Sequence, residues 1–183
     1  MNKVIALFLL ILLFPFLFIV SILILIEDGF PIFYKQEKYG INNSKFLMYK
    51  FRTMYKNTPL IPTQDFKNAT KYILISGKIF RKMSIDEIPQ LINIVKGEMN
   101  FIGPRPCMTS NENILFDLRN KSGVNKLKPG ITGWAQVNGR DDNNFDKKAK
   151  YDLYYLKNKN LFLDIKIIFK TFKILFNFKK IVH

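Results

Sequence analysis

The chain has 183 residues, and 29 Lys and Arg against 14 Asp and Glu give it a net charge of +15. Its single cysteine, Cys107, excludes an internal disulfide and a cysteine-rich zinc site. Its single histidine, His183, excludes Ser–His and Cys–His nucleophile pairs and multi-histidine metal sites. Catalysis must therefore use carboxylates, supported by lysine, arginine, tyrosine or a hard metal such as magnesium. The positive charge indicates an anionic partner, and the abundance of phenylalanine favours a membrane surface over nucleic acid.

The N-terminal segment Val4–Ile26 is a run of 23 residues without a charge. This length suffices for a single-pass membrane anchor, which needs about 20 residues. Pro15 divides the run into two halves of eleven residues, each about 16 Å long as a helix. Because proline kinks or breaks helices, the segment could also enter one leaflet and return to the same face. The Lys and Arg residues after the run place the body of the protein in the cytoplasm.

The next segments alternate between extended and helical patterns. Extended segments are predicted at Pro31–Lys35 and Lys45–Thr53, on either side of a turn at residues 39–43. Tyr55–Lys71, with its prolines and many polar residues, is predicted as a loop. A short helix is predicted at Ile73–Lys82. Ile85–Lys96 is also predicted as a helix because its apolar residues recur at helical spacing.

The C-terminal third is predicted to begin with turns and short extended segments over Lys128–Arg140, which contains three glycines. Phe145–Tyr155 is predicted as a helix. Leu161–Phe178 is apolar almost throughout, with one basic stripe formed by Lys166, Lys170 and Lys173. Such a stripe is typical of a helix lying in a membrane interface, and also fits a core helix with a solvated lysine face.

Asp86 and Glu87 are adjacent carboxylates at the start of the helix predicted over Ile85–Lys96. Ser84 and Glu87 fit a capping box, and Asp86 would complement the helix dipole. A helix N-terminus is also where an attacking carboxylate and a phosphate can be held together. The two interpretations are compatible, because Ser84 can cap the helix that presents Asp86.

Arg105 lies between two prolines in a Gly-Pro-Arg-Pro turn. The prolines restrict the backbone on both sides, which suits an arginine that binds phosphate through two donors. Lys50 and Arg52 alternate along a predicted strand, and Arg81 comes shortly before the carboxylates. A solvated charged face is the usual explanation of such a pair as Lys50 and Arg52, whereas Arg81 could balance the charge of the carboxylates or meet lipid phosphates.

Four segments together resemble the monotopic phosphoglycosyl transferases, also called the bacterial sugar transferase family. They are YKFRTM at 49–54, GKIFRKMSIDEIPQLINIVKGEMNFIGPRP at 77–106, KPGITGWAQVNGR at 128–140 and YDLYYLKN at 151–158. Each alone is only suggestive, but four in the family's order and spacing are highly specific. The resemblance extends from about Pro15 to the C-terminus, and is greatest to small stand-alone members that use UDP-linked acetamido or diacetamido sugars.

The resemblance implies an enzyme that transfers a sugar-1-phosphate from a UDP-sugar to polyprenyl (undecaprenyl) phosphate and releases UMP. Asp86 would be the nucleophile that forms an aspartyl-phosphosugar, and Glu87 its partner. Both would be ligands of Mg²⁺, the implied cofactor. Arg105 would contact phosphate. Five further residues match motif positions of the substrate- or phosphate-binding site with less certain roles: Lys50, Arg52, Arg81, Arg140 and, on the last motif, Asp152.

The predicted fold is therefore α/β: a small helix-rich domain with a minor sheet, an N-terminal re-entrant membrane helix and amphipathic interfacial helices. Residues 1–27 would form the re-entrant helix, broken at Pro15. Residues 28–183 would form the catalytic domain at the cytoplasmic face of the bacterial inner membrane, with a C-terminal interfacial helix. The implied role is the first membrane step of capsule, O-antigen or glycoprotein glycan assembly, with downstream glycosyltransferases as further partners and no nucleic acid.

The sequence departs from the family pattern in three places. Phe14 stands where a serine usually precedes the proline, and Lys56, Asn57 and Thr58 replace common acidic residues. The charged segment that normally precedes the re-entrant helix is missing, which suggests a truncation or a misassigned start. Two other functions stay open: a catalytically inactive basic scaffold on the membrane surface, and an anchored RNA-binding protein supported by charge alone. The sequence does not name the sugar.

Overall fold

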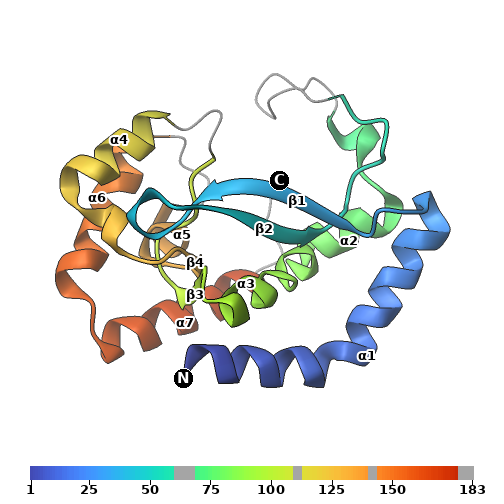
Figure 1. The fold of residues 1–183 in the computed structure, drawn as a ribbon, viewed down its shortest axis with the longest axis horizontal. Helices are drawn as coiled ribbons and strands as arrows, with labels where there is room; N and C mark the ends of the chain where they lie inside the picture. The colour runs from blue at the N-terminus through green and yellow to red at the C-terminus, as the bar shows by residue number, and fades with distance from the viewer. Residues whose placement is uncertain (60–68, 109–112, 140–143, 177–183) are drawn as a thin grey trace.

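A computed structural model describes residues 1–59, 69–108, 113–139 and 144–176. Its helices and strands are α1 Asn2–Asp28, β1 Phe33–Tyr39, β2 Lys45–Phe51, α2 Ile75–Lys82, α3 Gln90–Lys96, β3 Asn100–Ile102, α4 Asn113–Ser122, β4 Gly130–Thr132, α5 Trp134–Gly139, α6 Phe145–Asn158 and α7 Leu161–Phe176. Within the described ranges the strands form two sheets of two strands each. The prediction of a helix-rich domain with a minor sheet is therefore confirmed (Figure 1).

The hairpin of β1 and β2 crosses the middle of the molecule (Figure 1). The strands are antiparallel, from the pair Phe33 and Phe51 to the pair Tyr39 and Lys45. Phe46 and Met48 alternate with exposed neighbours and are buried against α3 and α1. This alternation places Lys50, two residues further on the same strand, on the side of the hairpin that faces the core helices.

The long helix α1 is attached to the rest of the protein at both of its ends. Near its N-terminus, Ala6 is buried in one core cluster, and the Asn2 amide Nδ2 donates to Asn100 Oδ1 at 3.1 Å. In its second half, Val20 and Ile24 are buried in another cluster. Between these anchors the helix contains Pro15, remains helical and bends (Figure 1). Helix α1 is therefore continuous through Pro15, where a break was predicted.

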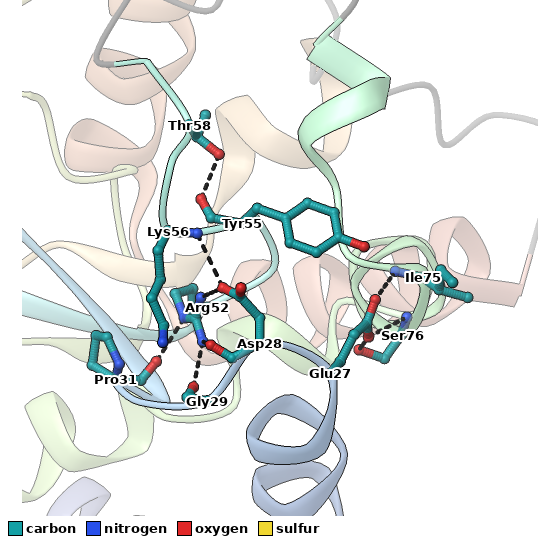
Figure 2. A network of polar contacts seen from close by, with 10 residues as sticks. All are labelled: Glu27, Asp28, Gly29, Pro31, Arg52, Tyr55, Lys56, Thr58, Ile75 and Ser76. Carbon is teal, nitrogen blue, oxygen red and sulfur yellow. Dashed lines mark hydrogen bonds and ion pairs between the residues drawn. The ribbon is translucent and has the colours of Figure 1, made fainter.

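Two carboxylates tie the C-terminal end of α1 to the domain (Figure 2). Glu27 accepts hydrogen bonds from the backbone N–H groups of Ile75 and Ser76 and from the Ser76 hydroxyl, so it caps the start of α2. Asp28 pairs with the guanidinium of Arg52, whose other donors bind the carbonyl oxygens of Gly29 at 2.5 Å and Pro31 at 2.6 Å. Arg52 thus fixes the angle at which the chain leaves α1.

Helices α1, α2 and α7 each expose several large apolar side chains. In the described ranges α1 is the one helix long and apolar enough to cross a membrane, and most of its large apolar residues are exposed. On α2 the exposed ones are one turn apart, at Ile75, Ile79 and Met83 just past its end. The helix predicted at the C-terminus is confirmed as α7, which exposes Leu161, Phe162 and Phe169 most strongly. These surfaces fit interfacial helices, although their contact with lipid stays a prediction.

Two local predictions were wrong. Residues 134–139 form a helix, α5, instead of extended structure, because Gly133 begins a turn that allows Val137 N–H to bond the Gly133 carbonyl at 3.1 Å. Residues 85–96 are not one helix: Ile85–Glu87 is a single 3-10 turn, and α3 begins only after Pro89. Helix α4 was not predicted at all.

Three glycines allow two distant motifs to meet backbone to backbone. Strand β3 pairs in parallel with β4, and Gly103 N–H donates to the Thr132 carbonyl at 2.9 Å. A Cβ on Gly130 would overlap Gly103 N, and a Cβ on Gly133 would overlap Gly103 O. Gly103 of Gly-Pro-Arg-Pro and Gly130 and Gly133 of the 128–140 motif are therefore required by one close approach.

We expect Gly133→Ala to lower the free energy of unfolding by at least about 3 kcal/mol, because the new methyl meets backbone that cannot move aside. The matched control is Gly123→Ala. Gly123 has φ of 75° with open space around it, so only the left-handed backbone is penalised, by about 1 kcal/mol. Thermal unfolding in detergent measures both. If both substitutions lowered the free energy of unfolding equally, the close backbone approach would not be the reason for a glycine at position 133.

Candidate active site

The two carboxylates lie on an unusual turn between α2 and α3. Ser84 has φ of 55°, in the left-handed region, and its side chain makes no capping hydrogen bond. The predicted capping box is therefore wrong, since Ser84 has a left-handed backbone and not the extended one typical of an N-cap residue. Glu87 N–H bonds the Ser84 carbonyl at 3.2 Å. The turn places Asp86 and Glu87 side by side in front of α3. A non-glycine residue held in this conformation is costly, and such strain is concentrated at functional sites.

Glu87 is the centre of a small charged cluster. Its Oε1 lies 2.7 Å from Lys50 Nζ of β2 and 3.5 Å from NH2 of Arg105. Glu87 and Lys50 are nearly buried, whereas the Arg105 side chain is 57% exposed. The structure therefore brings together three of the predicted site residues, Lys50 from the first motif and Glu87 and Arg105 from opposite ends of the second. Arg105 is the member of this cluster with room to meet a ligand.

Asp86 is half-buried beside this cluster. Burial raises the pKa of its carboxyl above the ordinary 3.8, and the adjacent charge of Glu87 raises it further, while Lys50 and Arg81 oppose both effects. Arg81 is itself held in place, because its Nε donates to Thr53 Oγ1 at 2.9 Å. Burial lowers the pKa of Arg81, and the charge of Asp86 counteracts this. A carboxylate that is poorly solvated yet flanked by cations is a reasonable candidate nucleophile.

The backbone around Arg105 is held by three different elements. The carbonyl of Pro104 accepts from Gly130 N–H at 2.9 Å, and the carbonyl of Cys107 accepts from Tyr39 N–H at 3.1 Å. The carbonyl of Arg105 itself accepts from NH1 of Arg119 on α4 at 2.7 Å. Gly103, Pro104, Pro106 and Cys107 are all buried. The loop is thus fixed while its one guanidinium projects outward, as the flanking prolines predicted.

Asp152 and Arg52 lie in other clusters. Asp152 on α6 is buried and pairs with Arg119, whose Nε and NH2 lie 3.0 and 2.6 Å from its Oδ2. Burial raises the pKa of Asp152, and the Arg119 charge opposes this. Arg52 is buried and its contacts are with the end of α1. Arg140 lies outside the described residues. Phosphate binding by these three stays a prediction, and the contacts of Arg52 and Asp152 indicate structural roles.

A cleft of about 680 Å³ opens beside the cluster. One part of its wall is charged and includes Glu87, Arg105, Arg119 and Lys148. The other part is apolar; its residues include Leu13 of α1, Ile88, Leu91, Val137, and Ile174 and Leu175 of α7. Asp86 lies between the wall residues Ser84 and Glu87 without lining the cleft itself.

Two wall residues were missed by sequence reasoning. Arg119 lies on α4, which no pattern predicted. The one signal that could have pointed to it is Asp152, because a buried carboxylate needs a cationic partner. Gln136 lies in the cleft wall, and its Oε1 is buried without a hydrogen-bond partner in the described ranges. An acceptor in that position is available to a ligand donor. No group of three or more metal-binding side chains occurs among the described residues.

Comparison with known sequences identifies the class of protein. The sequence profile of the family described as "Bacterial sugar transferase" matches residues 1–178. The uncharacterized sugar transferase EpsL of Bacillus subtilis (strain 168) is 39% identical, over 80% of this chain and 70% of the relative. The exopolysaccharide production protein ExoY of Sinorhizobium fredii is 35% identical, over 93% of this chain and 81% of that protein. The chain also matches, at 33% identity, 38% of the UDP-glucose:undecaprenyl-phosphate glucose-1-phosphate transferase of Escherichia coli (strain K12).

The chain therefore belongs to the bacterial sugar transferase family. It is a phosphoglycosyl transferase of that family, as the four motifs predicted.

Proposed function

We propose that this enzyme transfers a sugar-1-phosphate from a UDP-sugar to polyprenyl phosphate, with release of UMP, at the cytoplasmic face of the bacterial inner membrane. One observation carries the proposal: a single cleft joins the charged cluster of Glu87 and Arg105 to apolar walls from α1 and α7. A lipid phosphate has one charged end and one apolar chain, so such a cleft suits it. The names of relatives that act on undecaprenyl phosphate support the same assignment.

The first step of the proposed reaction is a displacement at phosphorus. An oxygen of the Asp86 carboxylate attacks the β-phosphorus of the UDP-sugar, the bond to the bridging oxygen breaks, and UMP leaves with that oxygen. The sugar-phosphate stays on Asp86 as an acyl phosphate. Poor solvation of Asp86, which is also what raises its pKa, leaves the carboxylate more reactive when it is ionised.

The second step returns Asp86 to its original state. A phosphate oxygen of polyprenyl phosphate attacks the same phosphorus, the bond to the Asp86 oxygen breaks, and the polyprenyl diphosphate sugar departs. Glu87 lies next to the nucleophile and is positioned by Lys50 and Arg105. In the proposal it orients the acceptor phosphate through these cations, which offset the charge on the phosphoryl oxygens.

The donor atoms around Asp86 fit Mg²⁺ in a limited way. Mg²⁺ is commonly held by one or two carboxylates together with substrate phosphates and water. Asp86 and Glu87 supply two carboxylates. Burial raises the pKa of Asp86, and a cation beside it would offset that effect by stabilising the ionised carboxylate. When bound, Mg²⁺ would neutralise charge on the diphosphate. We therefore propose that Asp86 and Glu87 hold it jointly with the nucleotide.

We further propose that α1 enters the membrane and returns to the same face. The attachments at its two ends support this, because Asn2 contacts Asn100 while Glu27 contacts Ser76, and both partners belong to the catalytic domain. A helix whose two ends meet one domain cannot place its N-terminus across a bilayer about 30 Å thick. The bend of α1 (Figure 1) makes the required change of direction, and a proline inside the helix, Pro15, favours such a bend.

The topology is tested with a cysteine placed in a short extension before Met1. We expect a membrane-impermeant maleimide to label it in inverted vesicles and not in intact spheroplasts. A second cysteine in place of Lys159, at the exposed loop between α6 and α7, is the control for the cytoplasmic face. Labelling of the N-terminal cysteine from the periplasmic side would show that α1 spans the membrane.

The function is tested by UMP release from a panel of UDP-sugars with Mg²⁺ and undecaprenyl phosphate. We expect one sugar to be strongly preferred, with UMP formed only when Asp86 is present. If the wild-type enzyme released no UMP from any UDP-sugar while still binding membranes, a non-catalytic scaffold would be the better assignment.

A further inference from the structure

Arg119 and Asp152 form a buried ion pair that reaches the active-site loop. The Asp152 side chain is 1% exposed and that of Arg119 is 9% exposed. Asp152 Oδ2 accepts from both Nε and NH2 of Arg119, which leaves NH1 directed at the loop. NH1 lies 2.7 Å from the carbonyl oxygen of Arg105 and 2.7 Å from Sγ of Cys107. The pair therefore joins α6 to the peptide that carries the Arg105 side chain.

This contact differs from the others that hold the loop. The carbonyls of Pro104 and Cys107 are bound by backbone N–H groups of Gly130 and Tyr39. The carbonyl of Arg105 is bound by a side chain, and the orientation of that side chain depends on Asp152. A charged donor makes a stronger hydrogen bond than a neutral one. Burying two charges is costly, so an apolar pair would often hold α4 and α6 together equally well.

We infer that Arg119 and Asp152 are positioning residues, which fix the Arg105 peptide so that its guanidinium meets both Glu87 and the phosphoryl group of the substrate. The inference rests on the proposed function for its effect on catalysis. Asp152 then acts through two other residues, Arg119 and Arg105, and does not itself touch the substrate. This assigns a role to the Asp152 position of the YDLYYLKN motif and to a residue, Arg119, that lies outside all four motifs.

Two substitutions separate positioning from general stability. Asp152→Asn keeps the shape of the side chain and removes its charge. The combined replacement Arg119→Met with Asp152→Leu removes the pair without leaving an unpaired buried charge. The control is Tyr155→Phe, also buried on α6, which loses a hydrogen bond from Tyr155 Oη to Asp164 Oδ1 at 2.7 Å and leaves Arg119 untouched.

The first readout is hydrogen–deuterium exchange of the full-length protein in nanodiscs. We expect both variants to accelerate exchange at the amides of Arg105 and Cys107 by on the order of 10-fold, with β1–β2 unchanged, because a local contact has been lost. Tyr155→Phe should leave these two amides as in wild type. Unchanged exchange in the Asp152→Asn protein and in the double replacement would overturn the inference, whatever the activity of the enzyme.

The second readout is a double-mutant cycle in kcat/KM for UMP release. Asp152→Asn should lower kcat/KM by roughly 10- to 100-fold, as a misplaced catalytic group does. In an Arg105→Ala background the same change should cost less than about 3-fold, because its target is already gone. Losses that multiply would overturn the inference and indicate that Arg119 acts directly on the substrate. A wild type that releases no UMP would instead contradict the proposed function, and the exchange experiment would still decide the inference.

Discussion

Asp86→Asn is expected to abolish UMP release and, at the same time, to raise the Tm of the protein. Loss of a nucleophile costs roughly 10³-fold or more in kcat. The gain in stability arises because the fold raises the pKa of Asp86 through burial, so the ionised carboxylate is disfavoured in the native state at pH 7. Replacing it by a neutral amide of the same shape removes this cost. Each 1 kcal/mol would raise Tm by about 2–4 °C.

The stability difference should depend on pH in a defined direction. Below the ordinary Asp pKa of 3.8, Asp86 is protonated in both folded and unfolded protein, so the wild type has no penalty. As pH rises through the raised native pKa, the unfolded state loses its proton more readily and wild-type stability falls. The gain from Asp86→Asn should therefore be largest at neutral pH and vanish near pH 3.8. Thermal unfolding of nucleotide-free protein in EDTA measures it.

The matched comparison is Glu87→Gln, which removes a carboxylate paired with Lys50. We expect this variant to lose stability where Asp86→Asn gains it, because the cation is left without its partner. A Tm for Asp86→Asn that is lower than wild type at pH 7 would show that Asp86 is a structural carboxylate.

Arg52→Met is expected to lower mainly the stability of the protein and Lys50→Met mainly its activity, although both residues belong to one motif. Arg52→Met should lower the free energy of unfolding by about 3 kcal/mol, because Asp28 and the carbonyls of Gly29 and Pro31 lose a buried partner. This corresponds to roughly 6–12 °C in Tm. Lys50→Met should cost less stability than Arg52→Met, because Glu87 keeps Arg105 at 3.5 Å, and should lower kcat by on the order of 100-fold, since one cation of the site is lost.

The control on the same strand is Lys45→Met, which removes an exposed pair with Glu37 at 3.0 Å and should alter neither quantity. Tm in detergent and UMP release with saturating substrates separate the two effects. A stable Arg52→Met enzyme with a raised KM for the UDP-sugar would restore the phosphate-binding assignment of Arg52.

The contrast between Lys50 and Arg52 shows that the sequence pattern predicted the strand but not the residue at which it ends. Period-two alternation predicted a strand with both residues on one face, and the strand itself is confirmed as β2. Strand β2, however, ends at Phe51, so Arg52 turns towards the end of α1 and its partners there. The position of a strand end depends on tertiary contacts, in this case on Asp28, which alternation cannot reveal.

The catalytic turn gives a second example. Apolar spacing predicted one helix over residues 85–96, whereas the left-handed Ser84 and Pro89 divide the segment into a 3-10 turn and α3. Pro89 was a visible signal of that division. The positive φ of Ser84 was not, because serine rarely adopts it. The motifs did predict which residues would meet: Lys50, Glu87 and Arg105 come from segments up to 55 positions apart and form one cluster.

Arg119 and the two attachments of α1 could not be predicted from the pattern of any one segment. Arg119 looks like an ordinary charge on a short polar helix, and only the fold shows that it is buried against Asp152. Likewise, hydropathy alone allowed α1 to span the membrane or to return, and the contact of Asn2 with Asn100 favours the return.

The most direct test of the proposed mechanism is the intact mass of the enzyme mixed with its preferred UDP-sugar and Mg²⁺, without polyprenyl phosphate. We expect a mass increase equal to one sugar-phosphate, located at Asp86 by peptide mapping, which disappears when undecaprenyl phosphate is added. UMP release that requires the lipid acceptor from the first turnover, with no adduct on Asp86, would contradict the two-step reaction.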